Sequence, residues 1–284
     1  MLAGQPYRNR LALSPRTARF GFTPRTFETV HVIAIANQKG GVGKTTTSVN
    51  LAASIALAEI PCVLVDLDPQ ANATSGVGLD PRIQGREGIY EVLRGELACG
   101  AALAQTAVEG LSIIPASPDL SGLESELLNE SDRFVRLRSA FAGAVELKDS
   151  VVVIDCPPSL GLLTLNALCA ASEVIVPLQC EYFALEGLSQ MTNTIQRVRG
   201  ALNRKLSLRG VLLTMFDIRN RLAVEVADEV KAHYPTFEAI VPRNIRLAEA
   251  PSHGLPIALY DPTSKGALAY LQLTREVLNS LPAD

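Results

Sequence analysis

Short runs of apolar residues, each bounded by polar or turn-forming residues, recur along the chain from about residue 30 onward. Such continuous runs are typical of strands buried on both faces of a parallel sheet. They predict strands at 32–36, 62–67, 111–115, 151–155, 173–177, 208–215 and 238–242. Between the first two, Val49, Ala52, Ala53 and Ala56 recur at the spacing of one helix face. This alternation of strands and helices predicts an α/β fold.

Further amphipathic stretches predict helices over 185–202, 222–233 and 265–281, and shorter ones over 120–129 and 132–141. In the last long helix, Leu268, Leu271 and Leu278 are the expected core contacts. The chain has 284 residues, of which 48% are hydrophobic, and this is enough for a sizeable core. We therefore expect one doubly wound domain over residues 30–284, with about seven or eight mostly parallel strands and helices on both faces.

A glycine-rich turn follows the first predicted strand and precedes the first predicted helix. Its residues are Lys39, Gly40, Gly41, Val42, Gly43, Lys44, Thr45 and Thr46. Glycines let successive backbone N–H groups converge, and a helix N-terminus adds a partial positive charge, so the turn suits phosphate oxygens. In such a loop Lys44 reaches the β- and γ-phosphates, Thr45 ligates Mg²⁺ and Thr46 contacts the α-phosphate. The alternative is a loop that only turns the chain.

Carboxylates stand at the ends of two other predicted strands. Asp66 and Asp68 end the second strand before Pro69, and Asp155 ends the run that begins at Val151. In open parallel sheets, ligands collect beyond the carboxyl ends of the strands. Asp155 is therefore expected to hold Mg²⁺ through water. For Asp66 and Asp68, the alternative to a role at the ligand is a simple turn over residues 66–69.

The glycine-rich loop departs from the strict phosphate-loop pattern, because Gln38 stands where that pattern has glycine. It carries instead a second lysine, Lys39, ahead of the double glycine. In this it resembles the deviant Walker A motif of the ParA/MinD family of ATPases. The run from Asp66 to Gly76 is similar to a second signature of the partition ATPases in that family, and 151–155 resembles its Walker B strand. The resemblance extends over nearly everything from Val30 onward.

This resemblance implies Mg²⁺-dependent hydrolysis of ATP between the two copies of a homodimer. Lys39 would then reach the partner's nucleotide, Asp68 would orient the attacking water, and Asp66 would belong to the magnesium shell. Pro242, Arg243 and Asn244 would lie at the adenine. Glu181 is expected near the nucleotide or the dimer seam.

The formal net charge of -3 and the pI of about 5.7 do not indicate a nucleic-acid-binding protein as a whole, so any DNA contact has to come from a local patch. Arg219, Arg221, Arg243 and Arg246 follow two different strands and are expected at one edge of the sheet. By resemblance to chromosomal partition ATPases, Arg219 and Arg246 match non-specific DNA contacts. Solvation, or pairing with nearby glutamates, is the alternative. The same resemblance implies a ParB-type partner that triggers hydrolysis and release from nucleoid DNA.

Residues 1–29 differ from the rest because they are basic and interrupted by proline. They contain Arg8, Arg10, Arg16, Arg19 and Arg25 against the single acid Glu28. We expect a flexible arm, and three roles are open for it: a solvated tail, a DNA-binding arm or a targeting peptide.

Two further features bear on location. A MinD-like protein that cycles on membranes is the alternative function, but it requires a basic amphipathic C-terminus, whereas residues 271–284 contain one basic residue, Arg275, and end on an acid. The five cysteines lack C-x-x-C spacing, which argues against a zinc or redox site, and Cys156 is expected as a small buried filler. The cysteine usage fits a reducing cytosol, and the family resemblance implies that the protein associates there with the nucleoid.

Overall fold

The apolar runs form the strands of one sheet in the computed structural model, which describes residues 30–83 and 87–281. The strands are β1 (His31–Ile35), β2 (Cys62–Asp66), β3 (Ala104–Gln105), β4 (Leu111–Ile114), β5 (Val151–Asp155), β6 (Glu173–Gln179), β7 (Ser207–Phe216) and β8 (Thr236–Pro242). All seven predicted strands are confirmed within a few residues. The short β3 was not predicted, since two residues carry no period.

Helices connect most of these strands. The longer ones are α2 (Lys44–Leu57), α7 (Leu162–Ala170), α8 (Ala184–Ala201), α9 (Arg221–His233) and α12 (Lys265–Ser280). The shorter ones are α3 (Asn72–Gly76), α4 (Ile89–Arg94), α5 (Leu123–Glu126), α6 (Arg136–Ala142), α10 (Ile245–Glu249) and α11 (Ile257–Tyr260). The 3₁₀ helices are η1 (Cys99–Ala102), η2 (Pro118–Ser121), η3 (Val145–Leu147) and η4 (Ala250–His253).

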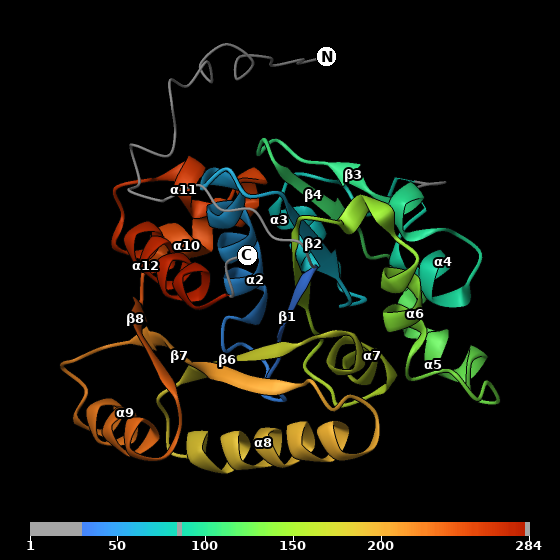
Figure 1. Cartoon of the computed structure of the whole chain (residues 1–284). Helices are drawn as coiled ribbons and strands as arrows, with labels where there is room; N and C mark the ends of the chain where they lie inside the picture. The colour runs from blue at the N-terminus through green and yellow to red at the C-terminus, as the bar shows by residue number, and fades with distance from the viewer. Residues whose placement is uncertain (1–29, 84–86, 282–284) are drawn as a thin grey trace.

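Within the described residues the sheet has eight strands in the order β3-β4-β2-β5-β1-β6-β7-β8 (Figure 1). The pairs from β4 to β8 are parallel and β3 pairs antiparallel with β4. The register sets Ile35 beside Asp155 and Asp155 beside Asp66. The strands β1, β2 and β5 therefore end at one level, which brings the glycine-rich loop and two carboxylates to the same edge.

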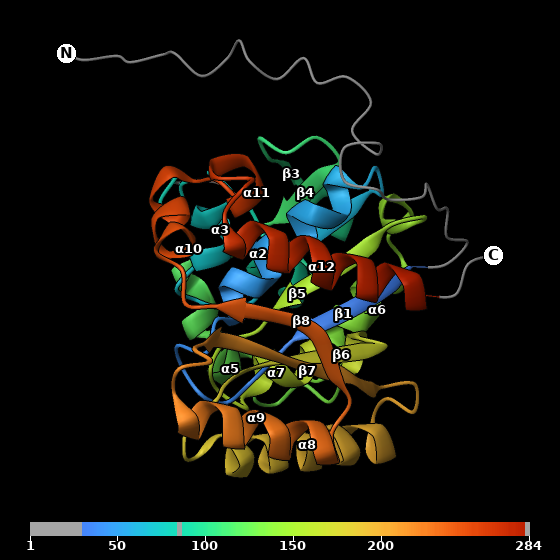
Figure 2. The same ribbon diagram turned by 90° about the vertical axis from the view of Figure 1, so that its left-hand side faces the viewer.

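Side chains alternate across the sheet and form two cores. Ile33 and Ile35 of β1 pack on the side of α2 and α12, whereas Val32 and Ala34 pack on the side of α7, α8 and α9. Figure 2 shows α2 and α12 on one face of the sheet and α8 and α9 on the other. The predicted doubly wound α/β fold is confirmed, because both faces of the parallel sheet are covered by helices.

Three sequence predictions are corrected by the fold. Leu268 was expected in the core of the last helix but is 55% exposed, whereas Leu271 and Leu278 of the same helix are buried. The helix predicted over 120–129 is instead the 3₁₀ helix η2 followed by the four-residue α5. The helix predicted over 132–141 begins only at Arg136, because residues 132–135 form a turn in which Val135 N–H donates to Asp132 O.

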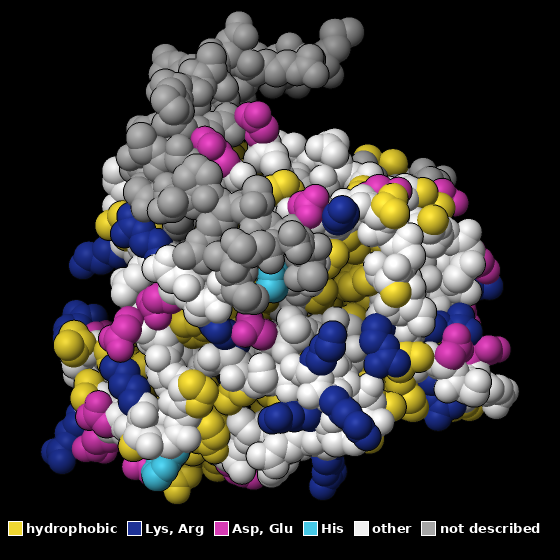
Figure 3. All heavy atoms as spheres, in the orientation of Figure 1, with side chains coloured by type: hydrophobic (Ala, Val, Ile, Leu, Met, Phe, Trp, Pro, Cys, Tyr) yellow, Lys and Arg dark blue, Asp and Glu magenta, His cyan; other side chains and the backbone are white. Residues whose placement is uncertain are grey.

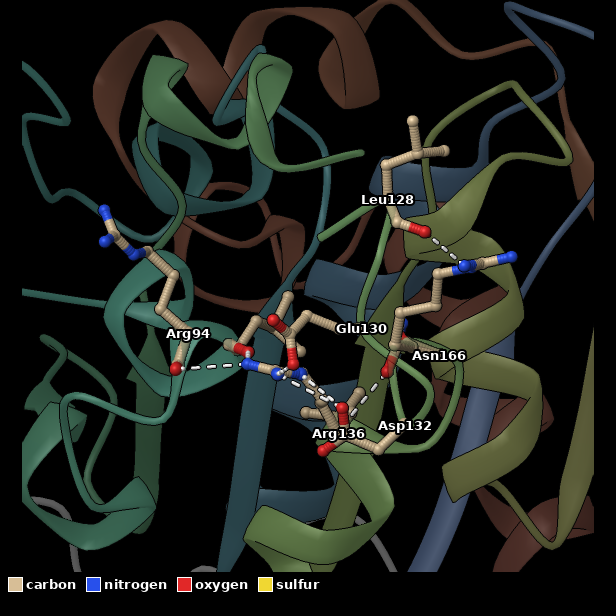
Figure 4. Close-up of polar contacts among 9 residues, drawn as sticks. Arg94, Leu128, Glu130, Asp132, Arg136 and Asn166 are labelled. Atoms are coloured by element: carbon tan, nitrogen blue, oxygen red, sulfur yellow. Dashed lines mark hydrogen bonds and ion pairs between the residues drawn. The ribbon is translucent and has the colours of Figure 1, made fainter. Parts of the chain in front are cut away.

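Arg136 explains why that turn precedes α6 (Figure 4). Its guanidinium pairs with Glu130 and Asp132 and donates to the carbonyl oxygens of Leu93 and Arg94, both at 3.1 Å. Asp132 is thus bound to the turn by its side chain and does not extend the helix. The same arginine joins the end of α4 to the beginning of α6.

The remaining general predictions concern the surface and the cysteines. No helix within 30–83 and 87–281 has the length and apolar character to cross a bilayer. Residues 1–29, where a basic arm was predicted, lie outside the described residues. All five cysteines are buried and free, and Cys156 is 1% exposed, as expected of a filler.

In the face drawn in Figure 3, Lys and Arg side chains gather over α7 and α8, so charge is distributed unevenly despite the small net charge.

Candidate functional site

The glycine-rich loop joins β1 to α2 and turns sharply at two glycines. Gly41 and Gly43 have φ angles of 73° and 87°, a region that residues with a Cβ rarely adopt. Gly43 is the N-cap of α2, and the helix begins at Lys44. A helix N-terminus leaves its first N–H groups without intrahelical partners and carries a partial positive charge. The loop therefore presents donors of the kind that bind anionic oxygens.

Lys44 lies largely buried at the start of this helix. Its Nζ donates to the carbonyl oxygen of Lys39 at 3.0 Å. Burial lowers the pKa of Lys44 below its usual value, and the nearby carboxylates of Asp155 and Asp68 oppose that shift. An ammonium that is partly desolvated in this way interacts more strongly with an anion than one in bulk water.

Asp155 ends β5 beneath the loop and is completely buried. Its Oδ1 accepts a hydrogen bond from Ser48 Oγ at 2.8 Å, while its Oδ2 has no hydrogen-bond partner among the described residues. Burial raises the pKa of Asp155, with Asp66 adding to the rise and hydrogen bonds from Ser48 and Thr45 opposing it. A buried, unpartnered carboxylate oxygen beside a threonine hydroxyl is a donor set that fits Mg²⁺, which prefers oxygen ligands.

Asp66 and Asp68 play different parts at the end of β2. Asp66 Oδ1 accepts from Asp68 N–H at 3.1 Å, and its Oδ2 accepts from both the N–H and the hydroxyl of Thr74 at 2.8 Å. Burial raises the pKa of Asp66 while these hydrogen bonds lower it. Asp68 lies just beyond the strand and accepts from Gln70 N–H at 3.0 Å. Asp66 thus holds the loop together, and Asp68 faces the cavity described next.

A cavity of about 660 Å³ opens over the loop. Of the predicted site residues it is lined by Gly40, Gly41, Gly43, Lys44, Thr45, Thr46, Asp68, Pro242, Arg243 and Asn244. Val42 is buried below it and accepts a hydrogen bond from Thr214 Oγ1 at 2.8 Å. Asp155 and Asp66 are also buried and do not line it. The structure therefore brings together residues predicted from three separate segments of the chain.

Several lining residues were missed in the sequence. They are Gln70, Asn72, Pro158, Thr214, Met215, Val241, Ile245, Leu247, Ala248 and Tyr270. Met215 adopts a φ of 49°, which is uncommon for a residue with a side chain. Tyr270 lies 223 residues from Thr47, and their hydroxyls are 3.2 Å apart. Position after a strand end could have indicated Thr214 and Met215, but nothing in the local sequence indicates Tyr270.

Lys39 does not line the cavity, and it contacts its own subunit. Its Nζ forms an ion pair with Glu181, which follows β6. Its N–H donates to Asn37 Oδ1 at 3.0 Å, and the amide of Asn37 donates to Pro177 O at 2.8 Å. These contacts tie the start of the loop to the end of β6, and they place Glu181 beside Lys39.

The predicted basic patch consists of exposed arginines that have acidic neighbours. Arg219 forms a two-pronged pair with Asp217, with N–O distances of 2.9 and 2.8 Å, and Arg246 pairs with Glu249 and Asp261. The pKa of Asp217 is lowered to about 2, mainly by hydrogen bonds from Arg219 and also by the charge of Arg243. The two loops thus share an electrostatic neighbourhood.

Arg221 is one of two patch arginines that pair with glutamates expected from the sequence. It pairs with Glu225, while Arg246 pairs with Glu249. These pairs are exposed, and exposed pairs of this kind exchange easily for other anions. Pairing therefore does not decide between the two predicted roles of the arginines.

Comparison with known proteins places the chain in a family. Residues 30–208 match a family model described as an AAA domain. The chain is 52% identical over 263 residues to the chromosome partitioning protein ParA of Myxococcus xanthus (strain DK1622), covering 91% of this chain and 92% of that protein. It is 50% identical over 248 residues to the sporulation initiation inhibitor protein Soj of Bacillus subtilis (strain 168), covering 87% and 97%.

A solved structure agrees with these relatives. The crystal structure of cobyrinic acid a,c-diamide synthase from Mycobacterium smegmatis, with bound ADP and magnesium, matches at a TM-score of 0.77 and 39% identity over 88% of this chain and 95% of that one. The agreement in fold and the identity over nearly the whole length of the relatives lead to one assignment. The chain belongs to the ParA/Soj family of chromosome-partitioning ATPases.

Proposed function

We propose that this chain is a DNA-partitioning ATPase that binds DNA as an ATP-bound dimer and leaves it when a ParB-type partner stimulates hydrolysis. One observation supports the proposal most directly. The glycine-rich loop, with Lys39 and Lys44, lies at the same edge of the sheet as Asp68 and Asp155. The family membership supports the partitioning role, and the magnesium and nucleotides bound in solved relatives support ATP and Mg²⁺ as the ligands.

The loop and the carboxylates divide the work of ATP hydrolysis. Backbone N–H groups of the loop, together with Lys44, bind the β- and γ-phosphates, and Thr46 contacts the α-phosphate. Thr45 would hold Mg²⁺ together with Asp155, the latter through water, and Asp66 would belong to the magnesium shell. Mg²⁺, when bound, neutralises charge on the phosphate oxygens. Asp68 orients the attacking water, because it is the carboxylate of this group that faces the cavity.

The cavity lining also suits a purine base. Pro242, Arg243 and Asn244 line the cavity, and so do apolar side chains such as Leu247 and Met215. Ligand sites of this type combine an apolar lining with a few polar groups that fix orientation. We assign Pro242, Arg243 and Asn244 to the adenine.

Dimerisation would occur at the edge that carries the loop. Lys39 would there offset charge on the partner's transferring phosphoryl group. The loop after β6 exposes Tyr182 and Phe183 beside Glu181, with 76% and 66% of each residue accessible and their rings in edge-to-face contact at 5.0 Å. Exposed aromatic residues are enriched in protein interfaces, which supports contact with a second copy on this side.

DNA would bind through the phosphates, without reading bases. Arg219 and Arg246 are the proposed contacts, because both are exposed, Arg219 in the loop after β7 and Arg246 in the short helix α10 after β8. Such binding weakens steeply with salt, as counterions return to the DNA. No strong general base appears at the site among the described residues, so turnover should be slow until a partner intervenes, which suits a switch.

Cosedimentation with DNA and with anionic lipid vesicles tests the proposal. The full chain with ATP and Mg²⁺ should pellet with nonspecific DNA at low salt, and it should stay in the supernatant with ADP or with vesicles. ATP hydrolysis should be slow and should rise when a ParB-type protein and DNA are added. Nucleotide-dependent pelleting with vesicles and not with DNA would instead indicate the MinD-like alternative. Nucleotide-independent behaviour in both assays would contradict the switch.

A further inference from the structure

The ammonium of Lys39 has two possible partners, Glu181 in its own subunit and the nucleotide of a second copy. Lys39 Nζ contacts Glu181 Oε2 within the same subunit, and their side chains are 41% and 48% exposed. Under the proposed function, the same ammonium acts at the nucleotide of a second copy. Both interactions cannot be made fully at once, because a carboxylate and a phosphoryl group on another subunit require different positions of the side chain.

The backbone around both residues is fixed, so only the side chains are free to exchange. Lys39 N–H donates to Asn37 Oδ1, and Lys39 O accepts from Lys44 Nζ, each at 3.0 Å. Glu181 N–H donates to Gln179 O, and Glu181 O accepts from Ala184 N–H, each at 2.9 Å. Rotation about the lysine side-chain bonds is therefore the motion that breaks the pair.

We propose that Glu181 is a positioning residue that restrains Lys39 inside its own subunit, and that ATP-dependent dimerisation breaks this pair in both copies. This inference rests on the proposed function, in which Lys39 acts across the dimer. The restraint is weak enough to yield, because both side chains are about half exposed and lysine makes a single-point contact. A partner's triphosphate carries more negative charge than one carboxylate and therefore wins the exchange.

The size of the effect follows from the symmetry of a dimer. An exposed pair of this kind changes an equilibrium by about 1.4- to 5-fold. Because two lysines leave two glutamates when a dimer forms, the dissociation constant of the dimer carries the square of this factor. Removing the restraint should therefore tighten the dimer by about 2- to 25-fold.

Sedimentation equilibrium of the full chain with Mg²⁺ and the non-hydrolysable analogue AMPPNP tests the inference. Glu181→Gln keeps the shape of the side chain and removes its charge. We expect its dimer dissociation constant to fall by about 2- to 25-fold at low salt. The difference from the native chain should shrink in high salt, since screening already weakens the pair there. A change in fold alone would not produce this salt dependence.

Glu186→Gln is the matched control. Glu186 is an exposed carboxylate in the first turn of α8, the helix that follows Glu181, and it accepts a hydrogen bond from the side-chain amide of Gln190 at 3.4 Å. This variant should leave the dimer constant within about twofold, and both variants should leave the ADP affinity of the monomer unchanged. An equal gain in the two variants would mean that general charge acts and not the contact.

Two other results would overturn the inference. A dimer constant in Glu181→Gln that equals or exceeds the native value would show that Glu181 does not restrain Lys39. Failure of every chain to dimerise, with AMPPNP or with ATP in a hydrolysis-deficient Asp68→Ala background, would remove the proposed function itself. The second failure differs from the first because it includes the native chain.

Discussion

Ser48 Oγ donates a hydrogen bond of 2.8 Å to Asp155 Oδ1, at the buried end of β5. The other oxygen of this carboxylate is buried and has no hydrogen-bond partner among the described residues. Ser48 thus fixes the orientation of a group that the sequence predicts as a magnesium ligand. Outer partners of this kind set how well a ligand holds its metal.

Replacement of Ser48 by alanine should weaken both the fold and magnesium binding. Asp155 would lose its donor while fully buried, so we expect the free energy of unfolding without Mg²⁺ to fall by about 1–3 kcal/mol. The Mg²⁺ concentration for half-maximal ATP hydrolysis should rise by about tenfold or more. Urea denaturation and a magnesium titration measure the two effects. Ser54→Ala is the control, because the Ser54 hydroxyl is buried on the same helix without a partner among the described residues. Equal losses in both variants would contradict a specific role for Ser48.

A second buried hydroxyl, that of Thr74, joins the end of β2 to the end of β4. It donates to Asp66 Oδ2 at 2.8 Å and accepts from Ala116 N–H at 3.0 Å. Thr74→Val keeps the shape but leaves both groups short of a partner, so unfolding free energy should fall by about 1–3 kcal/mol. Thr192→Val, at an exposed hydroxyl of α8, should stay within about 0.5 kcal/mol. Urea denaturation compares the stability of the two variants. An unchanged midpoint for Thr74→Val would show that the hydrogen bonds of the Thr74 hydroxyl contribute nothing to stability.

The sequence predicts the parts of the site that depend on local chemistry. Glycines before a helix, and carboxylates where a strand ends, are visible in short stretches because backbone conformation and strand register then bring them together. The hydrogen bonds of the Thr74 hydroxyl and the contact between Tyr270 and Thr47 cannot be predicted in this way. They join residues 42 and 223 positions apart, and their meeting depends on how α3 and α12 pack.

The helix α12 shows the same limit within one element. Leu268 and Leu271 are both leucines on an amphipathic helix, and spacing alone does not tell which lies at the margin of the buried face. The buried face is set by contact with α2 and β8, and it includes Ala267, Tyr270, Leu271, Thr274 and Leu278. Leu268 falls beside that face and is left exposed.

These two leucines form a natural pair of test variants. Leu271→Ala removes buried methyl groups and leaves space behind, so the free energy of unfolding should fall by about 2–4 kcal/mol. Leu268→Ala should change it by less than about 0.5 kcal/mol, because its side chain already contacts water. Thermal or urea denaturation distinguishes them. Equal costs would mean that Leu268 packs in solution against something other than this chain's core.

The ion pair between Arg219 and Asp217 predicts that removal of the Asp217 charge strengthens DNA binding. Asp217→Asn keeps an acceptor for the Arg219 N–H but removes the charge that engages the guanidinium. If Arg219 contacts phosphates, DNA affinity of the ATP-bound dimer should rise by about two- to fivefold at low salt, with a steeper salt dependence. Fluorescence anisotropy with labelled duplex DNA measures both. Glu229→Gln, with the same charge change at the far end of α9, should have no effect. A matching gain in this control would point to general charge.

Reversal of charge at Arg246 tests the other DNA contact separately from the ATPase cycle. In an Asp68→Ala background, proposed to trap the ATP-bound dimer, the parent chain should be retained on DNA for long periods with ATP. Adding Arg246→Glu should abolish that retention, since a phosphate contact becomes a repulsion, while sedimentation should show the same dimer. Loss of the dimer would mean that Arg246 serves assembly, and retention unchanged at low salt would remove it from the patch. Failure of Asp68→Ala itself to be retained would count against the water-orienting role of Asp68.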